Sequence, residues 1–80
     1  MKPTKRQAEV LGILIKGDSI IYDRFFCNAQ FLFKGDNIRL NTFLSLAKHQ
    51  WVAVTISLPV HVIWNITPAG ERALEEVQNG

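Results

Sequence analysis

Apolar residues recur along the chain with two different periods, and the change of period separates expected helices from expected strands. Over residues 4–16 the apolar positions return every three or four residues, as they do on one face of an α-helix. Thr4 and Gln7 have the spacing of a capping box, and Gly17 is suited to end the helix. The pattern therefore predicts a first helix over residues 4–16.

A second helix is expected at residues 40–50. At about 100° per residue, one arc of this helix collects apolar side chains, namely Leu40, Phe43, Leu44 and Ala47. The other arc is polar and carries Asn41, Thr42, Ser45, Lys48 and His49, with Leu46 as a flanking exception. We expect the polar arc to face outward.

Residues 51–66 change to a period of two. Large apolar residues occupy every second position at 52, 54 and 56 and again at 60, 62, 64 and 66, and Ser57-Leu58-Pro59 lies between them, so a β-hairpin is expected. Thr67 and Pro68 then have the residue types of an N-cap and a first helical position. The last helix would bury an apolar stripe of Ala69, Ala73, Leu74 and Val77.

Residues 18–38 fit two interpretations. Ile, Tyr and Phe favour strands, and Asn28 would mark a turn between strands at 20–24 and 30–34. The same stretch also fits the short helix that precedes the recognition helix of a helix-turn-helix. We favour a short strand pair at about 19–34. Residues 34–37, Lys-Gly-Asp-Asn, predict a turn in either case.

Length and composition set the class of protein. Eighty residues with 48% apolar content suit one domain, residues 1–80, with one core. No apolar run approaches the ~18 residues of a membrane span, so no membrane partner is expected. The single cysteine, Cys27, excludes an intrachain disulfide and favours a cytoplasmic location. The net charge is +2, and because residues 71–80 carry −2, residues 1–70 carry +4, which mildly favours an anionic partner.

The order of these elements resembles the winged-helix superfamily of small bacterial and phage regulators. Three stretches carry the resemblance: residues 4–14, residues 42–48 and residues 64–70, the last of which ends Ile66-Thr67-Pro68-Ala69-Gly70. The resemblance implies an α+β winged-helix domain with three helices and a C-terminal β-hairpin as the wing. Two features depart from the family: Gln50 stands where a glycine is common, and the wing tip, residues 57–59, has no basic residue.

The resemblance implies that the protein binds double-stranded DNA, as a transcriptional regulator of phage or mobile-element type. The helix at 40–50 would enter the major groove, where amide and guanidinium groups pair with base edges. Basic groups near the N-terminus and Lys34 would contact phosphates. The expected DNA-binding residues are Arg39, Asn41, Thr42, Ser45, Lys48, His49, Lys5, Arg6 and Lys34.

The alternative function is a protein–protein interaction module that does not bind DNA, acting in dimerisation or as an adaptor. Leu58 at the wing tip, with Phe25, Phe26 and Phe31, offers more apolar surface than a small core needs, although core burial is the expected fate of most of these aromatics. A homodimer fits both functions.

Catalysis has little support in the sequence. His49 and His61 lack companions at metal-ligand spacing, and a lone cysteine such as Cys27 is usually a small buried hydrophobe. Asp18, Asp23 and Asp36 are typical of turn or capping groups. No enzyme activity, cofactor, metal or small-molecule ligand is expected. Trp51 and Trp64 are expected to pack in the core rather than to stack on bases.

Overall fold

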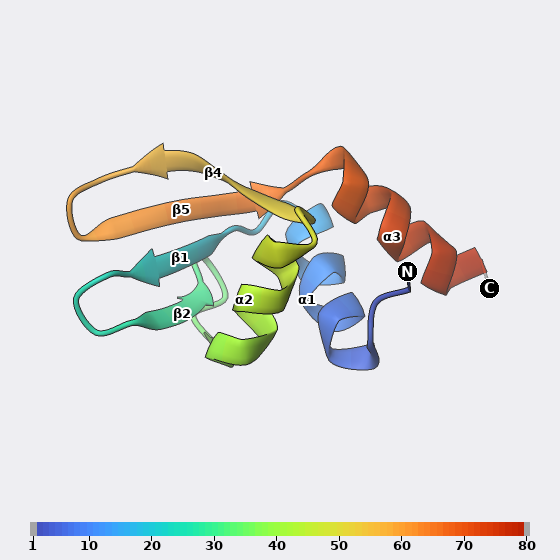
Figure 1. Ribbon diagram of the computed structural model, residues 1–80, viewed down its shortest axis with the longest axis horizontal. Coiled ribbons are helices and arrows are strands. Elements are labelled where there is room, and N and C mark those ends of the chain that lie inside the picture. The colour runs from blue at the N-terminus through green and yellow to red at the C-terminus, as the bar shows by residue number, and fades with distance from the viewer. Residues whose placement is uncertain (1, 80) are drawn as a thin grey trace.

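Five antiparallel strands join into one sheet, and three helices gather at one end of it (Figure 1). The computed structural model describes residues 2–79, and the elements named here lie within that range. In chain order they are α1 (Lys5–Ile15), β1 (Ile20–Asp23), β2 (Asn28–Phe31), β3 (Asn37–Ile38), α2 (Leu40–Lys48), β4 (Val52–Ser57), β5 (His61–Ile66) and α3 (Pro68–Asn79). The strand order across the sheet is β3-β2-β1-β5-β4.

The prediction of a winged-helix domain is wrong. That fold is led by helices and carries a C-terminal hairpin as its wing, whereas here the chain between α1 and α2 contains no helix and forms three strands. The central strand β1 pairs with both β2 and β5, so the C-terminal hairpin is part of a five-stranded sheet. The fold is α+β with an N-terminal helix and a strand-rich topology.

Individual elements lie close to their predicted positions, with two informative shifts. The three helices and the C-terminal hairpin are present, whereas the turn predicted at residues 34–37 lies at residues 32–34, because Asn37 already belongs to β3. The turn between β1 and β2 occupies residues 24–27 rather than Asn28, which starts β2. Phe25 and Phe26 therefore lie inside a tight turn, between the two strands.

Local chemistry explains how the helices begin and end. The Thr4 hydroxyl accepts from the Gln7 N–H and the Gln7 side-chain oxygen accepts from the Thr4 N–H, which completes the predicted capping box. Gln50 ends α2 in the left-handed region with φ 60°, and the Trp51 N–H donates to the Leu46 carbonyl. Gln50 therefore takes the conformation that a glycine adopts most readily.

The core lies on one face of the sheet. Val10, Leu11 and Leu14 of α1 meet Phe43 and Leu46 of α2 over the inward residues of the strands. Trp51 is buried, and Trp64 is half-buried with its ring edge-on to Phe43 at 5.1 Å between centroids. The helices thus cover one face, which we call the helix side, and leave the other as the open side.

The molecule is elongated, with extents of 39 × 22 × 20 Å. In Figure 1 α3 occupies the right end, α1 and α2 lie between it and the strands, and the loops of both hairpins, β1–β2 and β4–β5, reach the left end together. We call residues 22–28 and 54–62 the hairpin arm and the opposite end the helical end. This separation positions the two candidate surfaces described below.

Candidate binding surfaces

Helix α2 faces the core with a different arc from the expected one. Phe43 and Leu46 are its buried residues, whereas Leu40 and Leu44 are exposed, Leu44 by 51%. The apolar residues of this short helix span nearly half a turn, wider than the arc that it buries, so the periodicity alone fits two orientations. The one adopted buries Leu46 instead of Leu44, which rotates part of the predicted polar face inward.

Ser45 and Thr42 belong to the part that rotates inward. The Gln7 side-chain amide donates to the Ser45 hydroxyl at 2.8 Å, and this hydroxyl donates to the Thr42 carbonyl at 2.7 Å. Gln7 itself is buried. The Ser45 hydroxyl therefore links α1 to α2, and both Thr42 and Ser45 are half-buried.

Arg39, Asn41 and Lys48 remain exposed on α2 or at its N-cap. Asn41 and Lys48 are seven residues apart, so they lie on one stripe about 10 Å apart along the axis. No aspartate or glutamate occurs between residues 37 and 70. This stripe is accordingly free of carboxylates from its own segment, although Leu40 and Leu44 share it.

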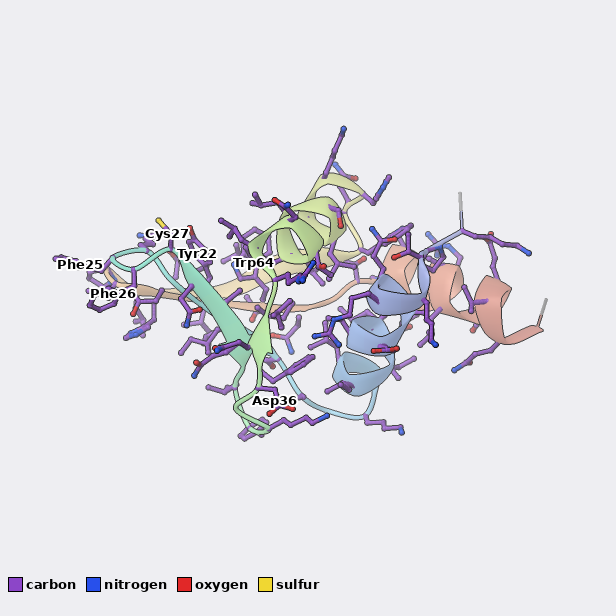
Figure 2. All side chains as sticks on the ribbon, turned by 90° about the horizontal axis from the view of Figure 1, so that it is seen from below. Tyr22, Phe25, Phe26, Cys27, Asp36 and Trp64 are labelled. Atoms are coloured by element: carbon purple, nitrogen blue, oxygen red, sulfur yellow. The ribbon has the colours of Figure 1, made fainter. Side chains whose placement is uncertain are left out.

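The other expected DNA contacts are dispersed. Lys34 forms an ion pair with Asp36 at 3.5 Å, and Figure 2 shows Asp36 on the opposite side of the view from α2. Lys5 and Arg6 are exposed in the first turn of α1, where Arg6 pairs with Glu9 at 3.2 Å.

The imidazole of His49 is half-buried and stacks on Trp51 at 4.5 Å. The structure thus brings Arg39, Asn41 and Lys48 onto α2 and separates Lys34 from them.

Two residues, Asp23 and Arg24, organise the end of the hairpin arm. One carboxylate oxygen of Asp23 accepts from the N–H groups of Phe25 and Phe26, at 2.8 and 3.2 Å. The Arg24 N–H donates to the Val60 carbonyl at 2.8 Å, and its guanidinium donates to the Ser57 hydroxyl at 3.0 Å and the Pro59 carbonyl at 3.5 Å. The Asp23 bonds order the β1–β2 loop, and the Arg24 bonds connect this loop to the β4–β5 hairpin.

Apolar side chains cover this end of the arm. Phe25 and Phe26 are 80% and 78% exposed, with their rings edge-to-face at 5.6 Å, and Leu58 and Val60 are exposed on the neighbouring loop. Figure 2 shows both phenylalanines at the far end of the molecule. The expectation that most of the middle aromatics are core is therefore wrong for Phe25 and Phe26, whereas Phe31 is buried.

Cys27 is also exposed, beside Phe26 in the same loop. Its φ is 51°, and its thiol donates to the Arg24 carbonyl at 3.9 Å. The expectation of a buried cysteine is wrong, because the residue lies in the exposed turn at residues 24–27.

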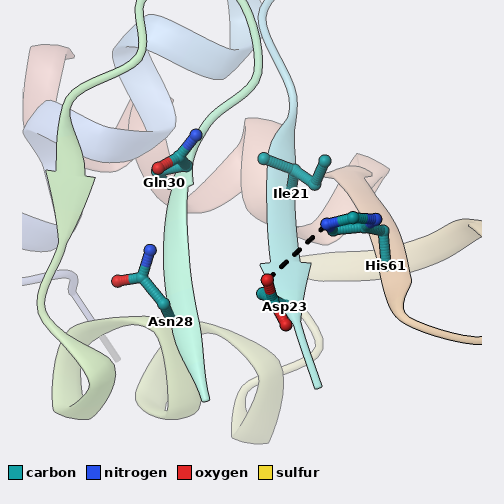
Figure 3. A pocket seen from close by; sticks show the side chains of 5 residues that line it. All are labelled: Ile21, Asp23, Asn28, Gln30 and His61. Atoms are coloured by element: carbon teal, nitrogen blue, oxygen red, sulfur yellow. Dashed lines mark ion pairs between the residues drawn. The ribbon is translucent and has the colours of Figure 1, made fainter. Parts of the chain in front are cut away.

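The open side of the sheet holds a small polar hollow. It is lined by Ile21, Asp23, Asn28, Gln30 and His61, with a volume of about 80 Å³ (Figure 3). The His61 Nε2 lies 3.6 Å from an Asp23 oxygen and forms an ion pair when the imidazole is protonated. Ligand pockets commonly have about 300–1,000 Å³, so this hollow is too small for a drug-sized molecule.

Asp18 has a structural role at the helical end. Its carboxylate accepts from the N–H groups of Ser19, Phe33 and Lys34, at 2.7, 3.0 and 3.1 Å. Burial raises the pKa of this carboxyl, but the hydrogen bonds from Phe33, Ser19 and Lys34, with the nearby Lys34 charge, outweigh burial and leave the pKa below its ordinary value. Asp18 and Asp23 are thus turn-organising groups, as their sequence context predicts.

Comparisons with known proteins assign no family. No family model matches the chain, and no curated protein and no solved structure matches it either. Among residues 2–79 no helix is long and apolar enough to cross a bilayer, and no cluster of three or more metal-ligating side chains is found.

Proposed function

We propose that this protein is a protein-interaction module and that its contact surface is the hairpin arm. The observation that carries the proposal is the pair Phe25 and Phe26, which are held in water by an ordered loop. Leu58 and Val60 extend the same apolar surface.

The free energy of exposed aromatics supports this function. Burying a phenylalanine side chain stabilises a protein by about 1.5–3 kcal/mol relative to leaving it exposed. Phe25 and Phe26 are adjacent and both exposed, so the isolated protein lacks this stabilisation at both positions. Contiguous apolar patches on small proteins commonly mark contact sites, and aromatic residues are enriched at the centres of interfaces.

The order of the loop supports it further. The Asp23 carboxylate and the Arg24 guanidinium form four hydrogen bonds, and the Arg24 backbone N–H forms a fifth, and these bonds set the positions of the two loops. A surface that is ordered before binding loses less conformational entropy when a partner arrives. The arm is therefore suited to contact a concave apolar site on another protein.

The experiment is an affinity capture from extract of the source cells with three forms of the protein. Phe25→Ser with Phe26→Ser removes the aromatic surface and leaves the backbone N–H groups that Asp23 binds. Phe33→Ser is the matched control, because Phe33 is 76% exposed but lies outside the arm. Proteins captured by the wild type and by Phe33→Ser should be lost with the double variant. Capture of the same proteins by all three forms would contradict the proposal.

DNA binding is the second candidate function, and the exposed stripe of α2 favours it. Arg39, Asn41 and Lys48 are exposed in a segment without carboxylates, and Asn and Arg side chains suit base edges. Leu44 would meet thymine methyl groups in the same groove. Thr42 and Ser45 are not part of this proposal, since they contact the protein's own chain.

A titration with duplex DNA at two salt concentrations tests the second candidate. Arg39→Ala with Lys48→Ala should weaken binding. The negative slope of the logarithm of the association constant against log salt should become shallower by about 2, one for each lost phosphate contact. Lys16→Ala with Lys34→Ala makes the same change of charge away from α2 and should leave binding unchanged. Equal loss in both double variants would indicate nonspecific attraction and would exclude a defined α2 interface.

A further inference from the structure

The two edges of the sheet differ in how they are protected. β3 forms one edge, has two residues and stands between Asp36 and Arg39. β4 forms the other edge, has six residues, and no charged side chain occurs from residue 50 to residue 60. Folded proteins usually protect an edge strand by making it short or charged, because its unpaired N–H and C=O groups otherwise bind another strand. β3 follows this rule, and β4 does not.

β4 also exposes apolar side chains on both faces of the sheet. Val54 is opposite Trp64 on the helix side, whereas Ile56 is opposite Ile63 on the open side. The bulge between Val54 and Ile56 causes this change of face, because it interrupts the strict alternation of a strand. Val54 and Ile56 are 47% and 52% exposed. A strand laid along β4 covers both, whereas a partner on one face covers only one.

We propose that β4 pairs with β4 of a second copy of this chain, across a two-fold axis, so that two five-stranded sheets join into one. Two-fold dimers are the commonest closed assemblies. Such a pair is antiparallel, so residues on one side of the axis meet residues from the other side of it, and like charges placed opposite one another destabilise strands. The uncharged segment from residue 50 to residue 60 avoids this repulsion, which makes an identical strand a suitable partner.

The size of the contact predicts a reversible dimer. Six strand residues with Leu58 beyond them would cover on the order of 600 Å² on each copy, near the lower limit of specific interfaces. The bulge at Thr55 increases local twist and limits the length that pairs regularly. We expect a dissociation constant on the order of 10 µM.

This proposal goes beyond the proposed function, because it depends on the backbone of β4 and not on Phe25 and Phe26. The test measures molecular mass by sedimentation equilibrium from roughly 1 µM to 1 mM, a range that spans the expected dissociation constant. The wild type should change from monomer to dimer with concentration. Ile56→Lys places an ammonium group from each copy in the short paired segment, where the two charges repel, and should raise the dissociation constant at least tenfold. Ile15→Lys is the matched control, since Ile15 is comparably exposed on α1, and it should dimerise as the wild type does.

Hydrogen exchange of the unmodified protein gives a second measurement that needs no variant. The β4 amides that do not pair with β5 should exchange quickly in dilute protein and become protected as the dimer forms. A wild type that stays monomeric throughout the range would overturn the β4 proposal and leave the extract experiment as the test of the arm. A dimer that Ile56→Lys preserves and Phe25→Ser with Phe26→Ser abolishes would also overturn it, and would place the contact at the phenylalanines.

Discussion

The helical end and the hairpin arm treat polar and apolar groups in opposite ways. At the helical end the buried Gln7 side chain forms two hydrogen bonds, and the Asp18 carboxylate accepts three. At the arm, hydrogen bonds of Asp23 and Arg24 order a loop in which Phe25 and Phe26 are exposed to solvent. Polar groups therefore complete a core at one end and present an apolar surface at the other.

This difference between the two ends indicates which part of the chain stabilises the fold. The thirteen buried residues of the core cluster lie on the helices and on strand positions beneath them, and none lies in the loops of the arm. Substitutions at the helical end should consequently lower the free energy of unfolding. Substitutions at the exposed positions of the arm should change association instead.

The largest expected effect is at Gly70, where α3 approaches Trp51. A Cβ added at Gly70 would collide with the Trp51 carbonyl, a backbone group that cannot move without shifting the strand after it. Gly70→Ala should therefore lower the free energy of unfolding by about 3 kcal/mol, measured by urea denaturation. The matched control is Gly12→Ala in α1, where an added Cβ meets nothing within 4 Å, and it should stabilise by about 0.5–1 kcal/mol. Equal effects of the two variants would show that α3 does not pack this closely.

The next effect is at Asp18, and it depends on pH. Asp18→Asn should cost about 1–3 kcal/mol at pH 7, because charge-assisted bonds to three N–H groups are weakened. The pKa of the folded-state carboxyl lies below the ordinary aspartate value of 3.8, so the stabilisation is present above about pH 4 and is lost as the pH falls through the folded pKa. Urea denaturation from pH 7 downward should show the two proteins converging in acid. A constant difference over that range would contradict the assignment.

A smaller and opposite effect is expected at Gln50. Its φ of 60° is unfavourable for a side chain with a Cβ and is readily adopted by glycine. Gln50→Gly should raise the free energy of unfolding by about 0.5–1 kcal/mol in a thermal or urea denaturation. The same change at Gln30, inside β2, should destabilise the protein, because glycine weakens a strand. Destabilisation at both positions would show that the αL conformation of Gln50 is not strained.

Periodicity predicted the helices and the last hairpin because each has an apolar pattern of its own. It did not predict the orientation of α2, since Leu40, Leu44 and Leu46 give this helix two plausible apolar arcs. The choice between them depends on α1, whose Gln7 side chain binds Ser45 from a position 38 residues away. Such a contact depends on the tertiary structure and leaves no pattern in the local sequence.

The fold class and the arm were missed for related reasons. Short apolar motifs support the resemblance to winged helices equally well whether or not residues 18–38 add strands to the sheet. Aromatic residues of a small domain are usually core, so the composition predicts burial for Phe25 and Phe26, although both lie between the expected strands 20–24 and 30–34. The sequence feature that indicates this turn is Asp23, a residue type typical of turns. Its carboxylate accepts from the N–H groups of Phe25 and Phe26 and so starts the turn at residue 24. The uncharged run from residue 50 to residue 60 was likewise visible in the sequence as a sign of an unprotected edge.

The smallest expected effect tests the central claim most directly, namely that Phe25 and Phe26 contribute to contacts and not to folding. The measurement is the free energy of unfolding in urea of Phe25→Ser with Phe26→Ser, beside the wild type and at a concentration low enough to keep both dissociated. The account predicts a difference within about 0.5 kcal/mol, as for exposed positions. A loss of about 3 kcal/mol or more, the size expected for a buried aromatic such as Phe31, would show that both rings belong to the core and would contradict the account.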